Sequence, residues 1–219
     1  MALVPLPKLR ATLIDVSRRL HANGWVANHD GNASVRLTGD RLLITCTAVS
    51  KRDVDDGALL VVDLNGKVLE GRRRPFSELD LHLAVYRARP EVDAVLHAHP
   101  PHATAWGLCG LELGPVAMPE VVVSLGSRIP TLPRALPKEP EAVKQVEAHA
   151  LRHDALLLSG NGVLTFGVDL GQALLRLELV EHYAHILTTA RLLGPVPPLS
   201  EGEVSKLLEA RKKAGLGPR

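Results

Sequence analysis

The chain has little cysteine, no long apolar run and no excess of charge of either sign. Cys46 and Cys109 are the only cysteines among 219 residues, too few for a disulfide framework, so we expect a reducing compartment, the cytoplasm. No apolar run approaches the roughly 18 residues of a membrane-spanning helix, and the N-terminus lacks a signal-peptide pattern. The 26 basic and 24 acidic residues nearly balance, which argues against nucleic acid or a membrane as partner.

The sequence also lacks internal repeats, low-complexity segments and any linker that would divide it. The Pro-rich run over residues 130–140 is expected to be a surface connection. With 46% hydrophobic residues, the chain can bury a substantial core. We therefore expect a single domain over residues 1–219. A mobile tail is expected from about residue 212, where the sequence becomes rich in Gly and Lys.

Apolar periodicity and turn signals predict a mixture of helices and strands. This mixture predicts an α/β fold in which helices cover a mainly antiparallel sheet. The expected helices are 6–22, 77–89 with Ser77 as N-cap, 101–106, 141–152, 169–193 and one from 200; the expected strands are 33–37, 41–45, 59–63, 67–70, 93–98, 121–124, 155–158 and 163–166.

The stretch 93–102 carries the clearest chemical signal. Side chains two residues apart in a strand point the same way, so His97 and His99 are expected to project side by side. Two imidazoles on one strand make half of a metal site, and zinc is the usual metal for nitrogen ligands. In isolation, such a pair is more often two strand-end histidines bound to water or to a backbone carbonyl.

Glu78 lies at the start of a predicted helix, roughly twenty residues before this strand. A carboxylate in this place can serve as a metal ligand or as a general base. Its commoner role is to complement the positive end of the helix dipole. His82 follows one helical turn later, so both side chains are expected on the same face.

Small polar residues gather at predicted strand ends. They offer backbone N–H groups with Asn and Thr side chains, and Ser77 adds a hydroxyl at a helix N-terminus, so together they can form a phosphate-sized anion site. Taken singly, plain turn and strand residues are the commoner interpretation. The candidate residues are Gly31, Asn32, Thr47, Ala48 and Ser77.

Taken together, these pieces resemble the class II aldolase/adducin family and, within it, the bacterial L-fuculose-1-phosphate aldolases. The resemblance covers nearly the whole chain. It includes GNASVR at 31–36, LLITCTAVSK at 42–51, VVDLNGKVLEG at 61–71, PFSELDLHLAVYRARPEVDAVLHAHPPHATA at 75–105, LLLSGNGVLTFG at 156–167 and GPVPPLSEGEV at 194–204.

The resemblance implies a three-layer α/β/α sandwich around a mostly antiparallel sheet. It also implies a C4 homotetramer with sites between subunits and one Zn²⁺ per subunit. By resemblance, His97, His99 and Glu78 hold the zinc, and Glu78 then acts as the catalytic acid/base. The implied reaction is the reversible cleavage of a ketose 1-phosphate, such as fuculose 1-phosphate, to dihydroxyacetone phosphate and an aldehyde. The implied phosphate ligands are Gly31, Asn32, Thr47, Ala48 and Ser77.

Three positions depart from the family pattern. The usual third zinc histidine is replaced by Asn161, whose amide oxygen is a poor zinc ligand beside imidazole. The usual Pro and Gly of the phosphate loop are Cys46 and Ala48, and no tyrosine occurs near residues 118–120. These departures keep three alternatives open: a pentulose-phosphate epimerase, a methylthioribulose-phosphate dehydratase, and a non-catalytic adducin-like member of the family.

Overall fold

The computed structural model describes residues 5–134 and 138–218. Its helices are α1 (Leu6–Ala22), α2 (Leu79–Ala88), α3 (Pro101–Leu108), α4 (Pro119–Leu125), α5 (Pro140–Ala150), α6 (Leu170–Leu193) and α7 (Glu201–Lys213), with single 3-10 turns η1 (Lys51–Asp53) and η2 (Asp56–Ala58). Its strands are β1 (Asn32–Arg36), β2 (Arg41–Thr45), β3 (Leu59–Asp63), β4 (Val68–Glu70), β5 (Ala94–Ala98), β6 (Thr131–Leu132), β7 (Ala155–Leu158) and β8 (Val163–Gly167).

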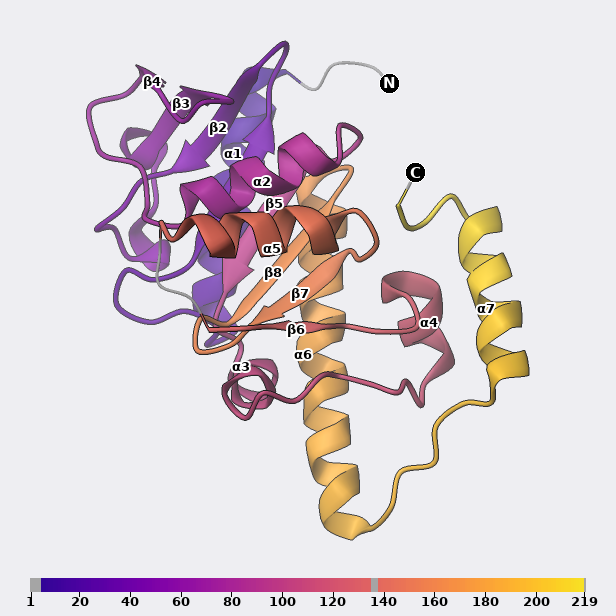
Figure 1. Ribbon diagram of the computed structural model, residues 1–219. Coiled ribbons are helices and arrows are strands. Elements are labelled where there is room, and N and C mark those ends of the chain that lie inside the picture. The colour runs from indigo at the N-terminus through magenta and orange to yellow at the C-terminus, as the bar shows by residue number, and fades with distance from the viewer. Residues whose placement is uncertain (1–4, 135–137, 219) are drawn as a thin grey trace.

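The strands form one sheet in the order β4-β3-β2-β1-β5-β8-β7-β6 (Figure 1). Every neighbouring pair is antiparallel except β6 and β7, which are parallel. All five residues of the central strand β5 are buried. The expectation of a mostly antiparallel sheet is therefore confirmed.

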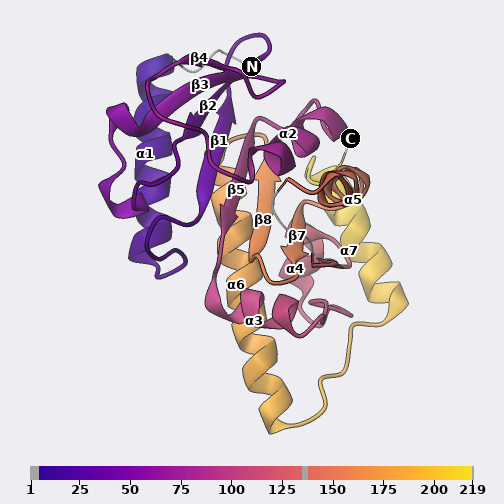
Figure 2. The same cartoon turned by 60° about the vertical axis from the view of Figure 1, so that its left-hand side comes forward.

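Helices cover both faces of the sheet and give three layers, with α1 and α6 on one face and α2 and α5 on the other (Figures 1 and 2). Side chains on opposite faces of the sheet form hydrogen bonds with the two helical layers. On β8, Thr165 donates a hydrogen bond to the carbonyl of Ala173 in α6. On β1, Ser34 bonds to His82 of α2. The predicted three-layer α/β/α sandwich is therefore confirmed.

The expectation of a strand over residues 121–124 is wrong. These residues lie in α4, which begins with Pro119 in its first turn and buries Val121, Val122 and Leu125. A short valine-rich run has strand propensity, but helix-compatible spacing of the buried side chains and packing against α6 and α7 decide its structure here. The predicted surface connection 130–140 contains the short strand β6, and its residues 135–137 lie outside the described chain.

The expectation that Ser77 caps α2 is also wrong. The helix begins two residues later, at Leu79, because the carbonyl of Glu78 accepts the first helical hydrogen bonds. The Ser77 hydroxyl donates instead to the Glu78 carboxylate, at 2.7 Å. Two other predicted caps are confirmed: the Asp169 side chain accepts from the Gln172 N–H at the start of α6, and Ser200 forms a capping box with α7.

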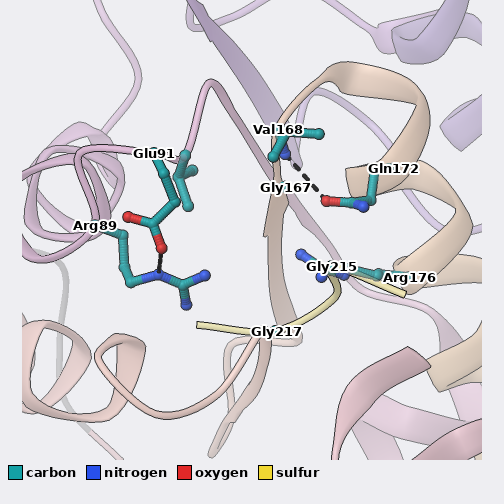
Figure 3. A pocket seen from close by; sticks show the side chains of 9 residues that line it. Arg89, Glu91, Gly167, Val168, Gln172, Arg176, Gly215 and Gly217 are labelled. Carbon is teal, nitrogen blue, oxygen red and sulfur yellow. Dashed lines mark hydrogen bonds and ion pairs between the residues drawn. The ribbon is translucent and has the colours of Figure 1, made fainter. Parts of the chain in front are cut away.

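A buried charge cluster connects three helices to the start of strand β7. Asp154 is fully buried and pairs with three arginines: Arg89 just after α2, Arg176 on α6 and Arg211 on α7. Each arginine also donates to a backbone carbonyl. Arg89 and Arg176 flank a small pocket, where Arg89 bonds to Glu91 (Figure 3). One carboxylate thus anchors three helical elements to the sheet.

None of the helices described is both long and apolar enough to cross a membrane.

Candidate active site

The predicted site residues converge at one edge of the sheet. Because their neighbours are antiparallel, β1 and β8 begin at the edge where β2 and β5 end. Asn32 opens β1 and is the ladder partner of His97 on β5. The sheet therefore brings the GNASVR segment and the His-Ala-His segment side by side, as the candidate site requires.

His97 and His99 face each other, as strand alternation predicts. Their Nε2 atoms are 3.2 Å apart. The Nδ1 atom of His97 lies 3.1 Å from the carbonyl oxygen of Val163, and the Nδ1 atom of His99 lies 3.2 Å from the Asp30 carboxylate. His97 is buried, whereas His99 is partly exposed.

These contacts fix the tautomers. A carbonyl or a carboxylate oxygen only accepts, so both Nδ1 atoms carry a proton, and the neutral imidazole of His97 turns the lone pair of its Nε2 toward His99. Burial, followed by the nearby His99, lowers the pKa of His97 to about 3, so its imidazole stays neutral at physiological pH. A lone pair on His97 Nε2 that faces a second imidazole can bind a cation, and the Asp30–His99 contact is typical of support for a metal-bound histidine. The histidine pair fits a metal ion.

Glu78 is linked to this pair through Asn32. Its Oε2 atom accepts hydrogen bonds from Ser77 Oγ at 2.7 Å and from Asn32 Nδ2 at 3.3 Å. Because Asn32 pairs with His97 across the ladder, the carboxylate is held on the histidine face of the sheet. Within residues 5–134 and 138–218, no group of three or more His, Cys, Asp and Glu side chains is already arranged to hold a metal ion. Ligation by Glu78 stays a prediction.

The two predicted phosphate loops adjoin the same edge. Gly31 precedes β1, which Asn32 opens, and Thr47 and Ala48 follow β2 after Cys46. A bridge between Cys46 and Pro75 places the Ser77 segment beside the second loop. The backbone N–H of Thr47 already donates to the carbonyl of Arg74 at 3.0 Å, so Thr47 can offer its hydroxyl but not this N–H. Ala48 adopts a φ of +59°, a conformation that favours glycine.

Asn161 lies in the turn that joins β7 to β8, with its N–H bonded to the carbonyl of Leu158. The next residue, Gly162, has a φ of +71°. A Cβ on this glycine would lie 2.2 Å from the carbonyl oxygen of Ala98 and 2.4 Å from Cδ2 of His99. The turn therefore packs directly against the histidine strand, which places Asn161 next to the candidate metal site.

The structure adds a buried hydrogen-bond chain around His82, which the sequence places one helical turn after Glu78, and two residues that pattern alone did not single out. His82 is fully buried and belongs to a chain in which its Nδ1 contacts Ser34 Oγ at 2.7 Å, and Ser34 Oγ contacts the Tyr86 hydroxyl at 2.8 Å. Asp30 contacts His99, and Lys51 interacts through space with Asp30 and Glu78, although neither residue has a chemical signal of its own in the sequence. Their roles depend on contacts between distant segments, so periodicity carries no sign of them.

The three-layer sandwich thus holds a histidine pair, a carboxylate linked to it through Asn32 and small polar loops at one sheet edge. The chain belongs to the class II aldolase and adducin family, since the family model described as Class II Aldolase and Adducin N-terminal domain matches residues 11–188. Class II aldolases are generally metal-dependent, typically with zinc.

Particular relatives are similar over most of their length. The L-fuculose phosphate aldolase of Escherichia coli (strain K12) is 33% identical over 210 residues, which cover 95% of this chain and 96% of that protein. A solved L-fuculose 1-phosphate aldolase superposes with a TM-score of 0.88 at 26% identity, covering 96% of this chain and 98% of that one. The methylthioribulose-1-phosphate dehydratase of Methylococcus capsulatus (strain ATCC 33009 / NCIMB 11132 / Bath) is 32% identical over 185 residues, 78% of this chain and 89% of that protein.

Proposed function

We propose that the protein is a zinc-dependent aldolase that reversibly cleaves a ketose 1-phosphate resembling fuculose 1-phosphate to dihydroxyacetone phosphate and an aldehyde. The observation that carries the proposal is the facing pair of His97 and His99 Nε2 atoms, 3.2 Å apart, with the Glu78 carboxylate held on the same face by Asn32. The similarity to L-fuculose phosphate aldolase over 95% of the chain supports the substrate class.

His97, His99 and Glu78 would hold the metal. Zinc, when bound, supplies Lewis-acid stabilisation of the negative charge that develops on the ketone oxygen as the C–C bond breaks. Glu78 holds or moves the proton, because its carboxylate reaches the histidine face and is oriented by hydrogen bonds from Ser77 and Asn32. The phosphate would be bound by Gly31, Asn32, Thr47, Ala48 and Ser77.

We further propose a cytoplasmic C4 homotetramer with sites between subunits. The family resemblance and the exposed apolar end of α6 support this assembly. Leu192 and Leu193 are 84% and 86% exposed, an unusual position for two adjacent leucines on an isolated monomer.

Turnover of a substrate panel tests the proposed activity. Protein purified with added zinc is incubated with fuculose 1-phosphate, 5-deoxyribulose 1-phosphate and methylthioribulose 1-phosphate, and dihydroxyacetone phosphate is measured. At least one ketose 1-phosphate is expected to release it. Consumption of methylthioribulose 1-phosphate without this product assigns a dehydratase, and no reaction across the panel contradicts an enzyme of this type.

A non-catalytic member of the family is the second candidate, and Asn161 is the observation that favours it. The turn that carries Asn161 packs against His99, so the protein offers two imidazoles where its family uses three. Zinc content of protein purified without chelator separates the two candidates. Stoichiometric zinc that is lost in His97→Ala supports the enzyme, whereas metal-free protein indifferent to this change supports a binding or assembly role.

Restoring a histidine at residue 161 is expected to tighten zinc binding. Imidazole is a better zinc ligand than an amide oxygen, and the turn is adjacent to His99. Asn161→His should lower the Kd for zinc about tenfold or more, the size of a substantial ligand contribution. Competition with a chromogenic chelator measures the Kd. An unchanged affinity would show that the side chain at residue 161 points away from the metal.

A further inference from the structure

Lys51 buries its ammonium group between two loops of the candidate site. It begins η1, directly after the LLITCTAVS segment, and only 1% of the residue is exposed. Its Nζ atom donates to the carbonyl oxygen of Val49 at 3.1 Å and, more weakly, to that of His29 at 3.5 Å. The side chain therefore connects the loop before β1 to the loop after β2.

This ammonium group has no carboxylate in contact among the described residues, since its two hydrogen bonds both go to carbonyl oxygens. Burial lowers the pKa of Lys51, while Cys46, Asp30 and Glu78 act on it through space in the opposite direction. A buried charge without a directly bonded counter-ion is unfavourable. Such a charge is best explained by an anionic ligand that completes its coordination.

The position of the charge identifies the ligand. His29 lies two residues before Gly31, and Val49 directly follows Ala48, so the ammonium sits between the two predicted phosphate loops. The groups predicted on these loops are uncharged, and the Thr47 N–H is already used. Of the neighbouring basic residues, Arg52 is exposed and pairs with Asp53, and Arg73 donates to the carbonyl of Gly57.

We propose that Lys51 is the cationic residue of the phosphoryl-binding site and that its third N–H bonds to a phosphate oxygen of the substrate. A lysine ammonium forms strong charge-assisted hydrogen bonds with phosphate. The assignment deepens the proposed function and rests on it for the identity of the sugar. It requires a phosphorylated substrate, because a neutral sugar leaves the buried charge uncompensated.

Binding of inorganic phosphate, measured by calorimetry on the zinc-free protein, tests the assignment without turnover. Lys51→Met is expected to weaken phosphate binding about 10- to 100-fold, the range for a lost hydrogen bond to a charged group. Lys51→Arg should retain part of the affinity, and the exposed neighbour variant Arg52→Met should bind as the unchanged protein does. Wild-type affinity in Lys51→Met, or no phosphate binding by the unchanged protein, would overturn the assignment.

A purely structural role for Lys51 predicts a different pattern. In that case Lys51→Met lowers Tm while the Kd for phosphate stays the same. Should Lys51→Met fail to fold, Lys51→Gln, whose amide can still donate to a loop carbonyl, is measured in the same way and must show the same loss. Phosphate binding can succeed while every sugar in the turnover panel fails, so the two proposals fail separately.

Discussion

Asp154→Asn is expected to lower the free energy of unfolding by about 3–5 kcal/mol, the usual cost of removing one partner from a buried ion pair. Asp154 is fully buried, and its two carboxylate oxygens form ion pairs with Arg89, Arg176 and Arg211. These arginines are themselves only 4–6% exposed. Asparagine keeps the shape but removes the negative charge, so three buried guanidinium groups lose their common counter-ion. Burial already lowers the pKa of Arg176 to about 10, because little solvent reaches the cluster to stabilise its charges.

Urea denaturation followed by circular dichroism measures this loss. The control is Glu112→Gln, which breaks the exposed pair with Arg128 and should cost no more than about 1 kcal/mol. Adding Arg211→Met to Asp154→Asn should recover part of the stability, because it removes one uncompensated charge. A loss below about 1 kcal/mol in Asp154→Asn would mean that other groups neutralise the arginines.

Glu78→Gln is expected to lower kcat by about 10²- to 10⁴-fold, the contribution of a positioned general acid/base. Glutamine has nearly the same shape and can still accept from Ser77 and Asn32, but it does not exchange a proton at neutral pH. The fold should therefore survive while proton transfer is lost. The rate is measured at saturating zinc and substrate, so that weaker zinc binding does not contribute.

Asp80→Asn provides the matched control for this change. Asp80 lies in the first turn of α2, two residues after Glu78, and is exposed. Its kcat should match that of the unchanged protein. A Glu78→Gln enzyme with full activity would show that another group carries the proton, whereas equal losses in both variants would point to damage at the start of α2.

Sequence patterns predict this fold well where the determining interactions are local. The Asp169 and Ser200 caps depend on residues three positions away and are correctly predicted. The facing histidines follow from strand alternation alone, since His97 and His99 are separated by a single residue. The run at 121–124 was ambiguous in principle, because a few valines fit a strand or a buried helix turn equally well and only the neighbouring helices decide.

Features that depend on distant contacts could not be predicted in this way. Asp154 and Arg89 are 65 residues apart in the sequence, and neither lies in a motif that signals burial. Lysine is usually exposed, and nothing next to Lys51 in the sequence indicates otherwise. Lys51 is nevertheless buried, because two loops close over its side chain. The bond of the Thr47 N–H to the carbonyl of Arg74 likewise joins two separate segments and required the structure.

The seam between β1 and β5 has a consequence for how activity depends on folding. The sheet consists of two runs, β4-β3-β2-β1 and β5-β8-β7-β6, which meet only at this seam. The first run carries Asn32 and the loop after β2, and the second carries the histidines and Asn161. A fragment that begins near residue 72 keeps His97, His99 and Glu78 but lacks Asn32 and the loop after β2, so we expect the two fragments to be inert alone and to regain catalysis only when they reassociate. Turnover by the proposed aldolase would then report docking of the two halves, which makes the protein suited to split-protein complementation.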